Sequence, residues 1–280
     1  MQFHYIAQID QRPVLYFALE MGTFELMAKS ISRISFERSE GEEILAQTTR
    51  SILKGRWKER YKKEEQYRNV IQSFQQYGDY YSNVVIHYGS EERPTIQDIS
   101  NATASYVART GRKPVVIIDY LQIMKPMDKR ATDKANVTTS VNGMKKLATT
   151  FHIPVIVISS FNRMNYRNEV SMEAFKESGE IEYSTDVLIG IQFRGMGEQG
   201  FDFNAAKKEQ PRQIEAVILK NRNGATGDTL NFAYYSMFNK FLDIDDDYKA
   251  PELHKAQTRV DKYGRVIQPQ KGILFNGKIK

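Results

Sequence analysis

Five short apolar runs divide the chain and form its clearest pattern. The runs are continuous rather than alternating, which is typical of strands buried on both faces in a parallel sheet. A further run at 84–88 is a sixth candidate strand. The five runs cover residues 14–19, 115–118, 155–158, 187–191 and 216–219.

Segments with apolar residues three and four apart lie between these runs and predict helices at 24–34, 96–109 and 137–151. Pro114 and Pro154 stand just before two of the strands, where a helix cannot continue. Strands that alternate with helices predict an α/β fold with a mainly parallel sheet, in one principal domain over residues 1–243.

Composition narrows the classes of protein. The 280 residues are 41% hydrophobic and 26% charged, which suits a folded domain rather than a disordered or fibrous chain. Because no apolar run approaches membrane-spanning length and no signal peptide opens the chain, we expect a soluble, cytoplasmic protein without a membrane partner. The absence of cysteine excludes disulfides, thiolate nucleophiles and cysteine-ligated zinc. The net charge of +6 favours a polyanion partner only if it gathers on one surface.

Two charged segments lie outside this pattern. Lysine and arginine are frequent at 54–63, which is typical of either a nucleic-acid-binding helix or a solvated helix with ion pairs to its interleaved glutamates. We favour the solvated helix. After Leu242 the sequence is first acidic and then basic with glycine and proline, so residues 244–280 are predicted to be a poorly ordered tail.

Polar residues end three of the predicted strands. One strand ends in Asp119, from which a carboxylate can hold Mg²⁺ or its water shell. Another ends in Glu20, which is suited to activating water for attack on a γ-phosphate. A third ends in Ser159 and Ser160, whose hydroxyls could contact the same phosphate. The alternatives are ordinary, because a terminal Asp often caps the next helix and serines are common in turns.

Five motifs together resemble the motor domain of DnaB-type replicative DNA helicases, over about residues 6–243. In order they are ALEM at 18–21, IDYLQIM at 118–124, FNR at 161–163, KESGEIE at 176–182 and KNRNG at 220–224. The resemblance implies a RecA-like P-loop NTPase core and a homo-hexameric ring. It also implies ATP binding and hydrolysis with Mg²⁺ as cofactor, and 5′→3′ movement on single-stranded DNA in DNA replication.

The resemblance assigns roles to individual residues. Glu20 falls on the catalytic glutamate, and Asp119 falls on the Walker B aspartate, which holds Mg²⁺ through water. Lys220 and Arg222 match a turn that such proteins insert into the neighbouring subunit's ATP site. A guanidinium there stabilises charge that grows in the transition state, although two cations in a turn can also simply face solvent. Ser160 falls beside the nucleotide.

Two further segments resemble the loops that contact single-stranded DNA in the channel of the ring. In such loops, backbone amides and basic side chains follow the phosphates. The second segment, which has a glycine between acids, is also compatible with a plain turn. The candidate DNA-binding residues are Lys129, Arg130 and Lys134 in the first segment and Lys176, Glu177, Ser178 and Gly179 in the second.

The family's phosphate-binding loop, the Walker A motif G-x-x-x-x-G-K-[ST], does not occur in the 280 residues. Its place in the family is just before the helix expected at 3–7, so the chain is expected to begin after this loop and its strand. ATP affinity should then fall sharply. Loss of an interior strand would also expose apolar faces on its neighbours, so we expect an isolated chain that is unstable or depends on another chain for the missing part.

Two smaller departures concern coupling and partners. Ser160 stands where the family usually has a glutamine that contacts the γ-phosphate and relays its presence to the DNA loops, and serine is too short for both contacts. The family's amino-terminal helical domain, which docks primase, has no counterpart. Primase and a helicase loader remain partners that the resemblance implies.

Three functions follow from these observations. The first is an ATP-dependent helicase motor whose sequence is truncated or split, and the second is a non-catalytic DNA-binding remnant of a phage or mobile-element helicase. A recombination mediator of RecA-like fold is the third, which the motifs at 119–122 and 220–224 disfavour.

Overall fold

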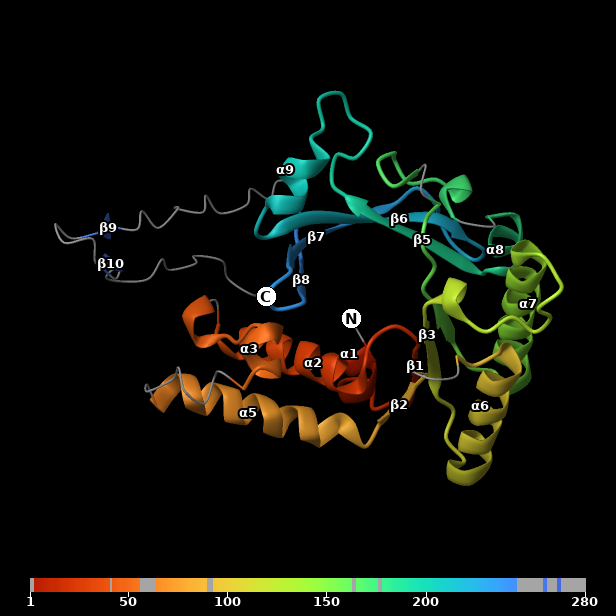
Figure 1. The fold of residues 1–280 in the computed structure, drawn as a ribbon, viewed down its shortest axis with the longest axis horizontal. Coiled ribbons are helices and arrows are strands. Elements are labelled where there is room, and N and C mark those ends of the chain that lie inside the picture. The colour runs from red at the N-terminus through yellow and green to blue at the C-terminus, as the bar shows by residue number, and fades with distance from the viewer. Residues whose placement is uncertain are drawn as a thin grey trace.

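The computed structural model shows two four-stranded sheets, with helices packed on both faces of the first (Figure 1). Figure 1 places the second sheet, β5 to β8, across one end of the first. The structure describes residues 3–40, 42–55, 64–89, 93–162, 165–175 and 178–245, and the short strands at 259–260 and 266–267.

The first sheet is parallel and has the strand order β2-β1-β3-β4. Proline carbonyls begin its ladder, because Pro13 O accepts from Val115 N at 2.8 Å and Pro154 O accepts from Val116 N at 3.0 Å. The parallel arrangement predicted for these runs is confirmed. The strands are β1 (Val14–Ala18), β2 (Val84–Tyr88), β3 (Val115–Asp119) and β4 (Val155–Val157).

Helices cover both faces of this sheet, with α1, α2 and α5 on one side and α6 and α7 on the other (Figure 1). The predicted helices at 24–34, 96–109 and 137–151 correspond to α2, α6 and α7. The predicted α/β class is therefore confirmed. The helices are α1 (Phe3–Gln8), α2 (Thr23–Arg38), α3 (Thr49–Leu53), α5 (Glu64–Tyr81), α6 (Ile96–Thr110) and α7 (Asp133–Phe151).

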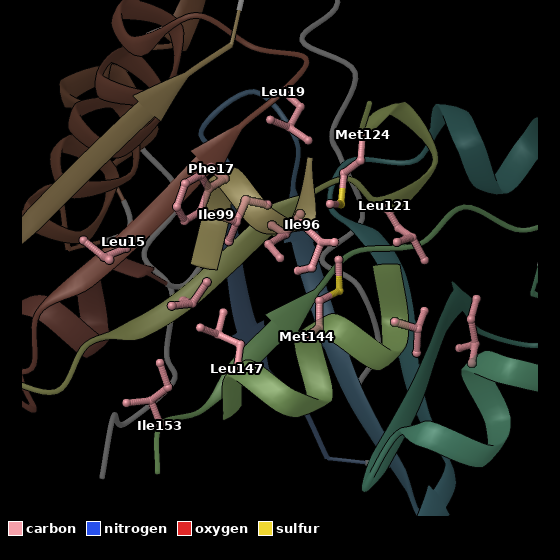
Figure 2. Close-up of a cluster of buried hydrophobic side chains, with 14 of the residues drawn as sticks. Leu15, Phe17, Leu19, Ile96, Ile99, Leu121, Met124, Met144, Leu147 and Ile153 are labelled. Carbon is pink, nitrogen blue, oxygen red and sulfur yellow. The ribbon is translucent and has the colours of Figure 1, made fainter. Parts of the chain in front are cut away.

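Side chains of β1 alternate between two cores, one on each face of the sheet. Leu15 and Phe17 pack with residues of α6 and α7 such as Ile99 and Met144, and Figure 2 shows this cluster. Tyr16, on the opposite face, packs with residues of α2 and α5. Because both faces are covered, every residue of β1 and β3 is buried.

Local sequence fixes the ends of α6. Thr95 and Asp98 form a reciprocal cap, in which Thr95 Oγ1 accepts from Asp98 N at 3.2 Å and Asp98 Oδ2 accepts from Thr95 N at 2.9 Å. Gly111 ends the helix with φ of 66°, a left-handed conformation that glycine adopts without strain.

The second sheet is antiparallel, with the order β5-β6-β7-β8. The prediction that the runs 187–191 and 216–219 belong to the parallel sheet is therefore wrong. The turn between β6 and β7 is too short for a parallel crossover, and β5 alternates between exposed and buried residues. Neither β7 nor β8 was predicted from the apolar runs. The strands are β5 (Val187–Phe193), β6 (Arg212–Asn221), β7 (Thr229–Tyr235) and β8 (Lys240–Asp243).

Strands β4 and β5 form one edge of each sheet, and both edges expose large apolar side chains. Ile156 lies on β4 and Ile158 just after it, while Val187, Ile189 and Ile191 lie on β5. Exposed apolar edges of this kind favour association with another chain. The absence of the family's first strand stays a prediction.

The remaining elements are short. They include η1 (Glu43–Leu45), η2 (Leu121–Ile123), η4 (Met172–Ala174), α8 (Ser178–Ser184) and α9 (Phe203–Lys208), and the antiparallel pair β9 (Arg259–Val260) and β10 (Val266–Ile267). Among the residues described, no helix is long and apolar enough to cross a membrane. Most of 246–280 lies outside the described residues, so the domain boundary at 243 and the poorly ordered tail stay predictions.

Candidate functional site

The structure brings Glu20 and Asp119 to the same edge of the parallel sheet. Strands β1 and β3 are neighbours in register, with Ala18 opposite Asp119, and Leu19 N donates to Asp119 O at 2.9 Å. Glu20 follows directly and is exposed, whereas Asp119 retains only 8% of its accessible surface. One acid is therefore held rigidly, and the other faces the solvent where a substrate would bind.

Tyr16 holds the buried acid. It lies on β1, is fully buried, and donates its hydroxyl hydrogen to Asp119 Oδ2 at 2.5 Å. Burial raises the pKa of Tyr16 well above its usual value, and the hydrogen bond to Asp119 raises it further, so the phenol remains a donor at neutral pH. This role of Tyr16 was not predicted from the sequence. The available signal was a single hydroxyl within an otherwise apolar strand.

The environment of Asp119 fits a magnesium ion. Tyr16 binds one carboxylate oxygen, which leaves Oδ1 as a hard oxygen ligand. Proteins commonly bind Mg²⁺ through one or two carboxylates, with water and substrate phosphates completing the octahedron. Within the described part of the chain, no three His, Asp or Glu side chains gather as a metal site.

Ser159 and Ser160 lie beside Asp119 because β4 pairs with β3. Gln122 bridges to both serines, since its Nε2 donates to Ser159 Oγ at 2.7 Å and its Oε1 accepts from Ser160 N at 3.2 Å. The loop after Asp119 is thus fixed to the predicted phosphate-contacting residues. Gln122 was part of a quoted motif but was given no role from the sequence.

The chain after Ser160 leads towards one of the predicted DNA loops. Phe161 forms an isolated bridge with Phe175, and Asn162 N donates to Ala174 O at 2.8 Å. The two phenylalanine rings meet edge to face, with centroids 5.1 Å apart. Backbone contacts therefore join the sheet edge to Phe175, which immediately precedes Lys176.

The first predicted DNA segment is exposed and braced. Lys129, Arg130 and Lys134 are all exposed, on the loop before α7 and on its first turn. Asp128 Oδ1 accepts from Arg130 N at 2.8 Å, and Asn136 Nδ2 donates to Asp128 O at 2.9 Å. The loop presents its three cations from a defined turn.

The second predicted DNA segment is described only in part. Lys176 and Glu177 lie outside the described residues, as does Arg163 of the FNR motif. Ser178 is the first residue of α8, and Gly179 is exposed with open space around its Cα. In the segment 54–63, only Lys54 and Gly55 are described, and they directly follow α3.

Lys220 and Arg222 lie at the end of β6, where the exposed turn to β7 begins. Their side chains bond within their own chain. Lys220 Nζ donates to Glu182 O at 2.5 Å, and Arg222 Nη1 lies 3.2 Å from Asp186 Oδ1. The turn is not buried in the core of its own subunit, so a second chain can reach it.

The parallel sheet flanked by helices, with acids at its carboxyl edge, places the protein in the RecA-like fold class. A helicase ATPase domain of known structure shares this fold, with a TM-score of 0.69 and 18% identity over 85% of this chain and 76% of that chain. A structure of a DnaB-like replicative helicase and its interactions with primase gives the same TM-score, over 85% of this chain and 52% of that chain.

The sequence matches the family DnaB-like helicase C terminal domain over residues 1–243, and the chain belongs to this family. It is similar to Replicative DNA helicase DnaB of Haemophilus influenzae, with 26% identity over 84% of this chain and 46% of the relative. It is also similar to the DnaB of Leifsonia xyli, with 32% identity over 49% of this chain and 28% of the relative. The chain thus spans about half or less of the length of these relatives.

Proposed function

We propose that this chain is the ATP-hydrolysing motor of a replicative DNA helicase, which moves 5′→3′ on single-stranded DNA as a ring of six copies. The observation that carries the proposal is the pairing of β1 with β3, which sets Glu20 and Asp119 side by side at one sheet edge. A base for water and a ligand for Mg²⁺ are the two protein groups that this reaction requires at that edge.

The two acids divide the work according to their surroundings. Glu20, exposed beyond the end of β1, accepts a proton from the water that attacks the γ-phosphate. Asp119, held by Tyr16, presents one oxygen in a fixed direction. Mg²⁺, when bound, neutralises phosphate charge that would otherwise oppose the attack.

The neighbouring subunit completes the site in this proposal. The turn carrying Lys220 and Arg222 is exposed, and a guanidinium retains several N–H donors after one of them bonds to Asp186. Placed beside a γ-phosphate in the next subunit, these cations stabilise negative charge as the phosphoryl group transfers. A head-to-tail interface of this kind closes naturally into a ring.

DNA binding is assigned to the segments before α7 and at the start of α8. The exposed cations Lys129, Arg130 and Lys134 suit phosphate contacts, which depend strongly on salt. Lys176, Glu177, Ser178 and Gly179 form the second proposed contact. Primase and a helicase loader are proposed partners, because the DnaB-like relative of known structure interacts with primase.

Nucleotide affinity depends on a phosphate-binding loop that the 280 residues do not contain in complete form. Gly272, Gly277 and Lys278 have the spacing of its first part, but Ile279 occupies the position of the hydroxyl residue. We propose that an upstream segment or another chain supplies this loop.

Hydrolysis of ATP, measured with and without single-stranded DNA, tests the proposal. The chain should be compared with a version extended upstream by a family phosphate-binding loop and its strand. In the extended version, Glu20→Gln should lower hydrolysis by at least about 100-fold, since general-base catalysis commonly contributes that much. Glu25→Gln, which removes an exposed acid of α2 that pairs with Lys29, is the matched control and should retain activity.

Equal activity of the Glu20→Gln and Glu25→Gln variants would show that Glu20 is not the base. If the extended chain binds single-stranded DNA but neither binds nor hydrolyses ATP, the protein is a DNA-binding module rather than a motor.

A further inference from the structure

The turn that carries Lys220 and Arg222 is anchored to one short segment of its own chain, residues 182–186. Lys220 Nζ donates to Glu182 O at 2.5 Å. Arg222 bonds twice to Asp186, because its backbone N donates to Asp186 O at 2.9 Å and its Nη1 lies 3.2 Å from Asp186 Oδ1. The placement of both cations therefore depends on this segment.

Asp186 joins three elements through a single carboxylate. Its Oδ2 lies 2.5 Å from Lys145 Nζ on α7, while Oδ1 faces Arg222. The hydrogen bond from Lys145 is the main cause that lowers the pKa of Asp186, so the carboxylate is charged at neutral pH. With 54% of the side chain exposed, these ion pairs add little stability, and their main effect is to fix geometry.

The anchoring segment is continuous with the proposed DNA contact. Residues 178–184 form α8, which begins with Ser178 and Gly179. Ile181, in the middle of this helix, is buried in the main core with Met144 and Leu188. A short helix fixed to the core moves as one body, so a displacement at its first residue reaches the carbonyls at its end.

We propose that Asp186 is a positioning residue that links single-stranded DNA bound at the start of α8 to the placement of Arg222. The ligand at one end is a DNA phosphate, and at the other end it is the γ-phosphate of a nucleoside triphosphate in the neighbouring subunit. This inference rests on the proposed function. It adds a route in which DNA acts through α8 on the next subunit's nucleotide site.

Hydrogen exchange of the full chain with and without an oligothymidylate tests this link and does not require ATP hydrolysis. In the wild-type chain, the oligonucleotide should slow exchange both in residues 178–186 and in the turn at 218–227. In Asp186→Asn, the slowing at 178–186 should persist, while that at 218–227 should fall at least about threefold, the expected effect of one exposed charge pair. Asp186→Glu, which keeps the carboxylate, should restore part of it.

Asp228→Asn is the control, because it makes the same charge change in the same exposed turn. It should behave as wild type. Equal slowing at 218–227 in Asp186→Asn and Asp228→Asn would overturn the link, as would wild-type protection confined to 178–186. Failure of the oligonucleotide to bind any of these chains would instead overturn the proposed function, and the link with it.

Discussion

The two sheets of this protein differ in what surrounds them, and the difference separates the proposed chemistry from the proposed contacts. In the parallel sheet, β1 and β3 are buried throughout, and the acid at the end of β3 is held by a buried phenol. In the antiparallel sheet, β5 exposes every second residue, and the turn after β6 carries exposed cations. Groups that need a fixed position lie on the enclosed sheet, and groups that meet a partner lie on the open one.

A pair of isoleucines tests this contrast with the largest expected effect. Ile118 on β3 is fully buried, whereas Ile191 on β5 is 59% exposed. Ile118→Ala should lower the free energy of unfolding by about 2–5 kcal/mol, because it removes buried methyl groups and leaves a cavity. Ile191→Ala should change it by less than about 1 kcal/mol. Urea denaturation of both variants provides the measurement, and equal losses would contradict the contrast.

Tyr16→Phe should have the next largest effect. The substitution keeps the ring but removes the donor to Asp119 Oδ2, which leaves a buried carboxylate without that partner. We expect a loss of about 1–3 kcal/mol in the free energy of unfolding. Tyr234→Phe, on the open sheet, is the control and should cost less. A Tyr16→Phe variant as stable as wild type would mean that the hydrogen bond does not hold Asp119.

The same phenol predicts a dependence on alkaline pH. Because burial raises the pKa of Tyr16 in the folded state, its contribution is complete below the unfolded pKa near 10 and is lost as pH rises towards the folded value. At pH 11, wild type should have lost about 1.4 kcal/mol more than Tyr16→Phe, relative to pH 8. Chemical denaturation at the two pH values measures this, and parallel losses would show that Tyr16 ionises normally.

The smallest effect on stability concerns the exposed edge. Ile191→Lys should change the free energy of unfolding by less than about 0.5 kcal/mol, since surface substitutions usually do. It should reduce self-association, because a charge on an edge strand opposes pairing with another chain. Light scattering at increasing protein concentration would show the decrease. An unchanged scattering curve would mean that β5 is not a contact surface.

The sequence predicted the enclosed sheet better than the open one, for physical reasons. Continuous apolar runs at 14–19 and 115–118 predicted strands buried on both faces, and Pro114 marked the start of one. The same reasoning failed for 187–191, where a run that looks uniformly apolar alternates between a covered and an open face. Strand direction depends on the connecting turn, which the apolar pattern does not contain.

The candidate site divides in the same way. Glu20 and Asp119 could be predicted because each ends a strand, and parallel strands end at one edge. The contacts of Tyr16 with Asp119, and of Asp186 with Arg222, join residues far apart in the chain, 103 positions in the first pair. Such contacts depend on strand order and register, which a single sequence does not specify.

The central claim is that one subunit's Glu20 and Asp119 act on a nucleotide that the next subunit completes with Lys220 and Arg222. Mixing two inactive variants of the upstream-extended chain, Glu20→Gln and Arg222→Ala, tests it most directly. If the site is shared, equal mixing should restore ATP hydrolysis to about a quarter of wild type, because one interface in four then pairs an intact base with an intact finger. Activity no higher than that of the two variants alone would contradict the claim.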